Sequence, residues 1–206
     1  ISADHLEAEM NRTLLQINMF ADLISTDKWR NISFDNAIPD RKPFPKPDIR
    51  LTIIPLGVAA VFGAGNFPLA FSVAGGDTIS ALAAGCPVVY KIHPGHPGTS
   101  ELVAHCINSA IAKSLLPPEI FSVLHGLSNQ VGKEIVTHPL IKAVGFTGSF
   151  KGGKTLYDLC VRRNIPIPFF GEMGSANPFF ILPEAMKKNW ENIADGFFKS
   201  LTLRSG

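Results

Sequence analysis

The chain has 206 residues, of which 46% are hydrophobic and 17% are charged, so it contains enough apolar material for a packed core and is not a disordered polypeptide. Its net charge of +2 gives no reason to expect nucleic acid or an acidic membrane surface as a partner. No apolar stretch approaches the roughly 18 residues needed to span a bilayer, and three widely spaced cysteines suggest neither a disulfide framework nor a zinc site, which favours a reducing cytoplasm.

The first 50 residues divide into a helical segment and a connector. Apolar residues recur at near-helical spacing over residues 3–23, which predicts an amphipathic helix within an N-terminal segment of residues 1–30. Four prolines then lie among charged residues, so residues 31–50 are expected to form an extended connector.

From residue 51 onward, short apolar runs alternate with amphipathic segments. The runs predict strands over residues 53–62, 87–92, 120–124, 141–146, 168–170 and 179–182. The segments predict helices over residues 67–84, 99–113, 128–137, 151–163 and 185–199, with Ser128 as an N-terminal cap. This alternation predicts an α/β domain over residues 51–206, with a Rossmann-like parallel sheet and helices on both faces. In such sheets ligands bind at the carboxyl ends of the strands, so the residues just after each strand are the candidates for a site.

The turn after the first core strand has the sequence Gly-Ala-Gly-Asn-Phe-Pro at residues 63–68. Its glycines allow a ligand to approach the backbone closely, although Pro68 breaks the G-x-G-x-x-G fingerprint. The amide of Asn66 is placed to donate hydrogen bonds at the mouth of the site. On spacing alone, an ordinary turn asparagine is the commoner explanation.

Lys91 ends the second core strand, where its ammonium group is suited to a ribose hydroxyl or a phosphate. A solvated surface lysine explains the position equally well. His93 and His96 follow, but two histidines without a carboxylate or thiolate neighbour are poor evidence for a metal, and we expect none.

Residues 148–155 match G-x-x-x-x-G-K-[ST], the phosphate-binding loop of nucleoside triphosphatases, between a strand and a helix. Two features weaken that interpretation, because three core strands precede the loop and no later strand ends in an aspartate for magnesium. A narrower prediction remains, in which a glycine-rich loop at a helix N-terminus binds some phosphate group.

Glu172 follows the fifth strand between two glycines and beside aromatic residues. Such surroundings favour a general base with a raised pKa, while a plain loop carboxylate is as good an explanation.

In this order, the motifs resemble the aldehyde dehydrogenase superfamily. They are Asn-Phe-Pro at 66–68, the lysine at 91, Phe-Thr-Gly-Ser at 146–149 with a closing glycine at 153, and Glu-Met-Gly-Ser-Ala-Asn-Pro at 172–178. The segments at 39–43, 67–78, 83–89 and 96–101 are closest to the branch of α-ketoglutaric semialdehyde dehydrogenases and an NADP-preferring fatty aldehyde dehydrogenase.

The resemblance implies the oxidation of a small-molecule aldehyde to a carboxylic acid with NAD or NADP. A cysteine thiolate attacks the carbonyl, Asn66 holds the oxyanion, and Glu172 activates the water that hydrolyses the thioester. The implied coenzyme-binding residues are Phe67, Lys91, His93, Gly126, Gly148, Ser149 and Gly153. Many NAD-preferring members carry a glutamate three residues after the lysine, where this chain has Pro94, so we expect NADP to be accepted.

The resemblance also places the nucleophilic cysteine beyond Gly206. Cys86 is expected to be a packing residue at a helix-to-strand junction, and Cys106 and Cys160 are expected to be core thiols within helices. We therefore expect a truncated chain without the catalytic-cysteine domain, inactive by itself, from an enzyme that is a homo-oligomer at full length. Two alternatives stay open: a P-loop nucleoside-triphosphate-binding protein and a non-catalytic binding module.

Overall fold

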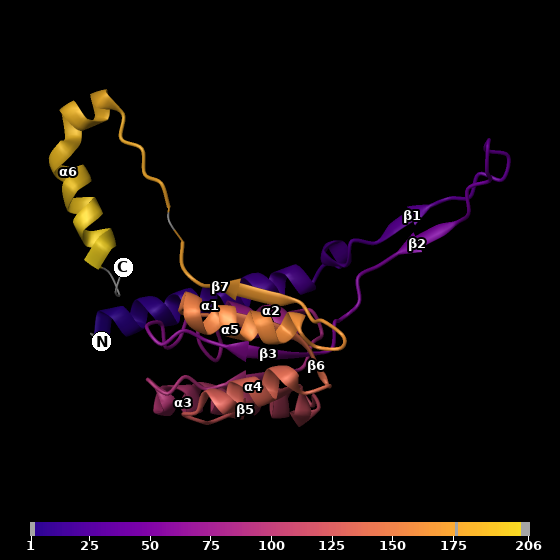
Figure 1. The fold of residues 1–206 in the computed structure, drawn as a ribbon, viewed down its shortest axis with the longest axis horizontal. Coiled ribbons are helices and arrows are strands. Elements are labelled where there is room, and N and C mark those ends of the chain that lie inside the picture. The colour runs from indigo at the N-terminus through magenta and orange to yellow at the C-terminus, as the bar shows by residue number, and fades with distance from the viewer. Residues whose placement is uncertain (1–2, 176, 203–206) are drawn as a thin grey trace. The chain divides into compact units, whose positions relative to one another are not determined.

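The structure, a computed structural model, describes residues 3–175 and 177–202, apart from the side chain of residue 27 (Figure 1). The described chain divides after Met173 into two compact units, each of which is considered by itself. Ala176, within the motif at 172–178, lies outside the described residues. In the part of the chain that the structure describes, no helix is long and apolar enough to cross a bilayer.

The first unit begins with helix α1 (Ala3–Ile24), as the apolar spacing predicts, and a short 3-10 helix (Asp27–Arg30). The connector is more ordered than expected. Its two ends pair as antiparallel strands β1 (Ser33–Asp35) and β2 (Ile49–Leu51), and the Lys42–Pro43 peptide bond between them is cis.

Five parallel strands form the sheet of this unit, in the order β5-β4-β3-β6-β7. They are β3 (Val58–Phe62), β4 (Val88–Lys91), β5 (Phe121–Leu124), β6 (Ile141–Thr147) and β7 (Phe169–Glu172). The predicted Rossmann-like α/β fold is therefore confirmed, with β3 at the centre of the sheet.

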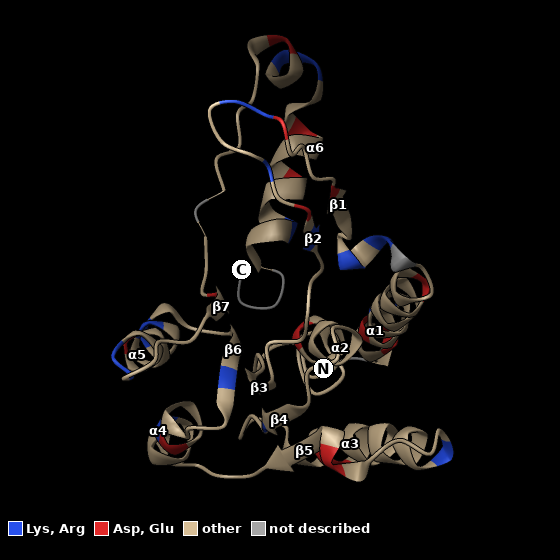
Figure 2. Ribbon diagram, turned by 90° about the vertical axis from the view of Figure 1, so that its right-hand side faces the viewer, with Lys and Arg blue, Asp and Glu red and all other residues tan. Residues whose placement is uncertain are grey.

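Helices cover both faces of the sheet (Figure 2). They are α2 (Gly76–Ala83), α3 (Pro97–Lys113), α4 (Asn129–Thr137) and α5 (Phe150–Val161). One face packs against α4 and α5, and the other packs against α2 and α3, with α1 lying along α2. The Ser128 hydroxyl accepts a hydrogen bond from the Gln130 N–H and caps α4, as predicted.

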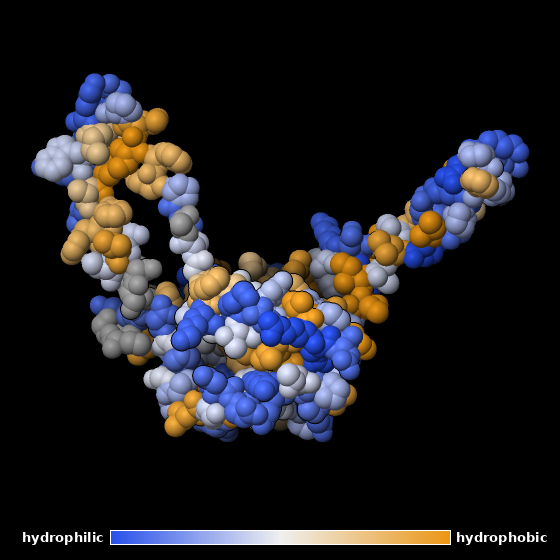
Figure 3. All heavy atoms as spheres, viewed as in Figure 1, coloured by the Kyte–Doolittle hydropathy of each residue, from blue (hydrophilic) through white to orange (hydrophobic). Residues whose placement is uncertain are grey.

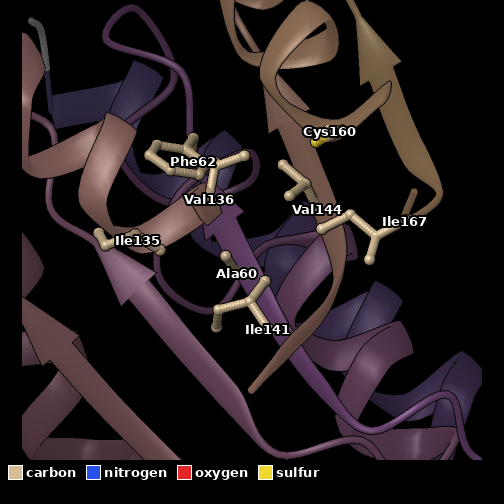
Figure 4. Close-up of a cluster of buried hydrophobic side chains, with 8 residues drawn as sticks. All are labelled: Ala60, Phe62, Ile135, Val136, Ile141, Val144, Cys160 and Ile167. Atoms are coloured by element: carbon tan, nitrogen blue, oxygen red, sulfur yellow. The ribbon is translucent and has the colours of Figure 1, made fainter. Parts of the chain in front are cut away.

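The core alternates across the central strand because successive side chains of a strand point to opposite faces. Ala60 and Phe62 pack with the buried residues of α4 and α5 (Figure 4), whereas Val61 packs with those of α3. Both clusters consist mainly of buried aliphatic side chains, so the middle of the sheet is closely packed.

The helix expected over residues 67–84 is wrong in its first half. Residues 67–75 form turns, and α2 begins only at Gly76. Hydrogen bonds to residues outside the segment hold those turns. The Ala64 N–H donates to the Phe71 carbonyl at 2.8 Å, and the buried carboxylate of Glu9 in α1 accepts the Leu69 N–H. Tertiary hydrogen bonds have overridden the apolar periodicity here.

The strand expected over residues 53–62 is shorter than predicted, since only Val58–Phe62 pairs with neighbours. The strand expected over residues 179–182 is wrong. These residues belong to the second unit, which starts at Gly174, and Phe179 and Phe180 are exposed. An apolar run without a neighbouring strand to pair with does not form a sheet.

The second unit contains helix α6 (Pro183–Thr202), which is kinked at Asn189, where φ is −146°. Its aromatic residues Trp190, Phe197 and Phe198 are more than half exposed. Figure 3 shows the hydrophobic residues of this helix at the surface of its own unit.

Candidate functional site

The carboxyl ends of the parallel strands lie at one edge of the sheet. In the strand register, Phe62 of β3 pairs with Lys91 of β4 on one side and with Phe146 of β6 on the other, and Thr147 pairs with Glu172 of β7. Lys91 and Glu172 are thus three strand spacings apart, roughly 14 Å at ~4.8 Å per strand. This edge is long enough to receive an extended ligand.

The connections leave the two central strands in opposite directions. From β3 the chain passes through α2 to β4, and from β6 it passes through α5 to β7 on the other side. Such a switch point between neighbouring strands is where open α/β sheets bind their ligands. The turns after β3 and β6 flank this point, and they carry Asn66 and Ser149.

The turn after β3 needs its first glycine. A Cβ atom at Gly63 would lie 2.7 Å from the Phe71 carbonyl oxygen and would collide with the Tyr90 hydroxyl. Asn66 is exposed beyond this point, and the ring of Phe67 packs edge-on against Phe71 at 5.1 Å between centroids. The turn therefore places Asn66 just beyond the carboxyl end of β3.

Lys91 and His93 lie beside the same turn. A Cβ atom at Gly65 would meet His93 Nε2 at 2.8 Å, so the histidine packs directly on the turn backbone. Burial lowers the pKa of Lys91. Burial, followed by the charges of His96 and Lys91, lowers the pKa of His93. An anion bound beside Lys91 would offset the cost of keeping the lysine charged.

His96 has a structural role in the loop. Its ring stacks on that of His93 at 5.3 Å, and its nitrogens lie 3.0 Å from the Ala64 carbonyl and 3.0 Å from the Ser100 hydroxyl. Among residues 3–175 and 177–202, no three histidine, cysteine, aspartate or glutamate side chains gather as a metal site would require.

Gly126 follows β5 at the same edge, next to β4. Its φ of +156° and its closeness to Val131, whose Cγ2 would lie 2.7 Å from an added Cβ, both favour glycine at this position.

The loop after β6 joins the N-terminus of α5 to the end of β7. Ser149 caps the helix by accepting the Gly152 N–H at 3.3 Å, and the Gly148 N–H donates to the Glu172 carbonyl at 3.0 Å. Gly153 packs against the residue after β7, since an added Cβ would lie 2.6 Å from Met173 Cγ. The N-terminus of this 12-residue helix, with its positive dipole end, lies at the candidate edge.

The same loop does not form the phosphate site of a nucleoside triphosphatase. Lys154 turns along the helix and pairs with Asp158 at 2.6 Å, and the Thr155 hydroxyl donates to the Lys151 carbonyl at 2.8 Å. The lysine and the hydroxyl that a P-loop directs at phosphate and magnesium are both engaged within the helix. The P-loop alternative is not supported.

Glu172 shares a small cavity of about 50 Å³ with Asp77 of α2 and Thr147 of β6. The Thr147 hydroxyl donates to Asp77 Oδ2 at 3.3 Å. Burial raises the pKa of Asp77, the hydrogen bond from Thr147 opposes that rise, and the charge of Glu172 adds to it. Two carboxyl-bearing residues thus line one small cavity.

The sequence analysis missed Asp77. No local signal marked it, since an acidic residue in the first turn of a helix is common there and complements the helix dipole. Its partners Thr147 and Glu172 are 70 or more residues away in the sequence. The missing side chain of Gly145 leaves room for Asp77, since a Cβ atom at Gly145 would lie 3.3 Å from Asp77 Cβ.

None of the three cysteines, all of which the structure describes, lies at this edge. Cys86 is buried just before β4, as expected of a packing residue. Cys160 is buried near the end of α5, where burial raises the pKa of its thiol to about 11. The expectation that Cys106 is a core thiol is wrong, because its side chain is exposed on α3. A thiolate nucleophile for this site would therefore come from outside these residues.

The sequence matches the model of the aldehyde dehydrogenase family over residues 2–206. The chain belongs to this family. It is 48% identical over 201 residues to α-ketoglutaric semialdehyde dehydrogenase 2 of Azospirillum brasilense and 47% identical to α-ketoglutaric semialdehyde dehydrogenase of Acinetobacter baylyi. These alignments cover 98% of this chain and 38% of each relative, so the chain spans well under half of an aldehyde dehydrogenase of that length.

Solved structures agree with the fold. An NADP-dependent enzyme of E. coli superposes with a TM-score of 0.75 at 25% identity, over 98% of this chain and 38% of its own. An aldehyde dehydrogenase of Pseudomonas syringae, described as complexed with NAD⁺ and octanal, superposes over 95% of this chain and 36% of its own, with a TM-score of 0.74 at 22% identity.

Proposed function

We propose that this chain is the coenzyme-binding part of an NAD(P)-dependent aldehyde dehydrogenase that oxidises an aldehyde to a carboxylic acid. The observation that carries the proposal is the alignment of Asn66, Lys91, Ser149 and Glu172 along one carboxyl edge, across the switch point between β3 and β6. Residues 51–206 belong to this part, and the nucleophilic cysteine is supplied from outside it.

The coenzyme is held along this edge. Its pyrophosphate lies at the N-terminus of α5, against Gly148, Ser149 and Gly153, where backbone N–H groups and the helix dipole favour an anion. Lys91 takes the adenosine ribose or its 2′-phosphate, with His93 beside it. Pro94 brings no carboxylate to repel a 2′-phosphate, so NADP is accepted as well as NAD. Phe67 and Gly126 complete the coenzyme-binding residues of this edge.

The two proposed catalytic residues act at different steps of the reaction. The bound coenzyme supplies the acceptor for the hydride. The Asn66 amide donates a hydrogen bond to the oxyanion that forms when a thiolate adds to the aldehyde carbonyl. Glu172 takes a proton from the water that hydrolyses the thioester.

α-Ketoglutaric semialdehyde is the proposed substrate, on the strength of two relatives of that name at 48% and 47% identity. The full-length enzyme is a homo-oligomer. The three free cysteines favour the reducing cytoplasm as its compartment.

Fluorescence titration of the chain with NADPH and NADH tests the coenzyme part of this proposal. We expect saturable binding of NADPH, weakened about tenfold or more in Lys91→Ala, since a charged hydrogen bond is worth ~1.5–3 kcal/mol. Lys113→Ala is the matched control, because Lys113 is exposed at the far end of α3.

Failure of the wild-type chain to bind either coenzyme would contradict the proposal. Saturable hydrolysis of ATP with magnesium, lost in Lys154→Ala, would instead support a nucleoside triphosphatase.

A further inference from the structure

Glu9 of α1 is a buried charged residue on an otherwise ordinary amphipathic helix. Only 1% of its surface is exposed, whereas Glu7 on the same helix is exposed. A carboxylate is buried at high cost unless hydrogen bonds compensate it, so the partners of Glu9 indicate what it does.

Those partners lie in the turn that carries Asn66. Glu9 Oε2 accepts the backbone N–H of Leu69 at 2.9 Å and that of Ala70 at 3.3 Å, residues that are 60 and 61 positions away in the sequence. Its other oxygen lies 3.1 Å from His5 Nε2, one helical turn earlier. Charge-assisted bonds of this kind are about twice as strong as neutral ones.

The contact acts on a segment that has no regular structure of its own. Residues 67–75 form turns, and two of their N–H groups are satisfied by the side chain of another element. Pro68, which is buried, stands between Asn66 and the first of these N–H groups and restricts the backbone there. Fixing Leu69 and Ala70 therefore fixes the path of the chain up to Asn66.

A second contact between the same two elements lies nearby. Arg12, less than one turn after Glu9 on α1, lies over the ring of Phe71 with its guanidinium carbon 4.7 Å from the ring centroid. The Phe71 carbonyl in turn accepts the Ala64 N–H on the other arm of the turn. The N-terminal helix thus contacts the turn at two points, one anionic and one cationic.

We propose that Glu9 is a positioning residue for Asn66, holding the turn that presents the oxyanion-binding amide at the edge of the sheet. This role rests on the proposed function, in which Asn66 binds the oxyanion. It gives the N-terminal helix a part in catalysis although α1 lies outside the sheet, along α2 (Figure 2).

Amide hydrogen exchange in the 206-residue chain tests the contact itself. In Glu9→Ala we expect the Leu69 and Ala70 amides to exchange at least tenfold faster, while the Val144 amide in the centre of β6 keeps its protection. Glu9→Gln retains a side-chain oxygen that can accept these N–H groups but carries no charge, so its exchange rates should fall between those of the wild type and Glu9→Ala. Glu7→Gln is the control on the same helix.

Unchanged protection at Leu69 and Ala70 would overturn the proposal. So would an equal loss of protection at Val144, because that pattern indicates global destabilisation rather than release of the turn. Glu9→Gln keeps the test decisive if Glu9→Ala does not fold.

Turnover in the longer polypeptide that supplies the cysteine tests the catalytic role. We expect Glu9→Ala to lower kcat about tenfold and to leave the coenzyme KM unchanged, because removing an oxyanion donor lowers kcat by ~10²–10³ and misplacing one lowers it less. We expect Glu9→Gln to have a kcat between those of Glu9→Ala and the wild type. A wild-type kcat in Glu9→Ala would overturn the positioning role. If Asn66→Ala has a wild-type kcat, the proposed function of Asn66 fails, while the exchange result for the Glu9 contact stands by itself.

Discussion

Asp77 is a buried acid whose surroundings disfavour its charge. Burial raises its pKa in the folded chain above the unfolded value of 3.8, and the charge of Glu172 adds to that rise. Folding therefore favours the protonated form, so the stabilising effect is complete below the unfolded pKa and is lost as the pH rises through the folded pKa.

Replacing Asp77 by asparagine removes this cost at neutral pH while leaving an oxygen to accept the Thr147 hydroxyl. We expect Asp77→Asn to raise Tm at pH 7, by roughly 2–4 °C for each kcal/mol relieved. The gain should shrink as the pH is lowered toward 4. Thermal unfolding, followed by circular dichroism at several pH values, measures this difference in Tm between Asp77→Asn and the wild type. A Tm difference that grows on acidification would show that the sign of the shift is wrong.

Gly63 tests the packing beneath the Asn66 turn. In Gly63→Ala the new methyl group would meet the Phe71 carbonyl and the Tyr90 hydroxyl, and Tyr90 is fully buried. We expect a loss of about 2 kcal/mol or more in the free energy of unfolding, as for overpacked cores. Gly98→Ala in the first turn of α3, with nothing within 4 Å of its Cβ, is the matched control and should change stability by less than about 0.5 kcal/mol. Equal effects of the two substitutions in urea unfolding would contradict this packing.

The elements that the sequence predicted well are apolar strands and amphipathic helices that pack against one another. Strands β4 and β6 are apolar runs largely covered on both faces, and the edge strand β5 buries Phe121. Helices α3, α4 and α5 have an apolar stripe that meets the sheet. The prediction failed over residues 67–75, because Glu9 and the Phe71 carbonyl hold the backbone in turns that periodicity does not encode. It failed again over residues 179–182, where the apolar run has no strand beside it in its own unit.

Substitutions in the loop and helix after β6 distinguish a coenzyme site of the aldehyde dehydrogenase family from a phosphate-binding P-loop. Lys154 pairs with Asp158 on the exposed face of α5, and such surface pairs contribute ~0–1 kcal/mol. Lys154→Ala should therefore leave the Kd for NADPH within about twofold of wild type. Ser149→Ala, which removes the helix cap beside the proposed pyrophosphate, should lower the stability by about 1 kcal/mol. A large loss of NADPH affinity in Lys154→Ala would restore a direct phosphate role for that lysine.

At the scale of the whole molecule, the placement of the candidate residues at one edge of the sheet could be predicted, because the position of strand ends depends only on topology. Lys91 and Glu172 end strands β4 and β7, and Asn66 and Ser149 lie in the turns after β3 and β6. The parallel register brings these positions to one edge. The residues that support them were not predictable in this way. Glu9 is buried at 1% exposure against a turn 60 residues later, and only the folded chain shows that contact.

The central claim is that one coenzyme molecule lies across the carboxyl ends of β3, β4 and β6. Backbone amide chemical-shift mapping of the 206-residue chain during titration with NADPH tests it most directly. We expect shifts concentrated at Gly65, His93 and Gly152, with Gly57 and Leu140 at the opposite, amino edge unchanged. Shifts centred on the amino edge, or scattered over both faces of the sheet, would contradict the claim.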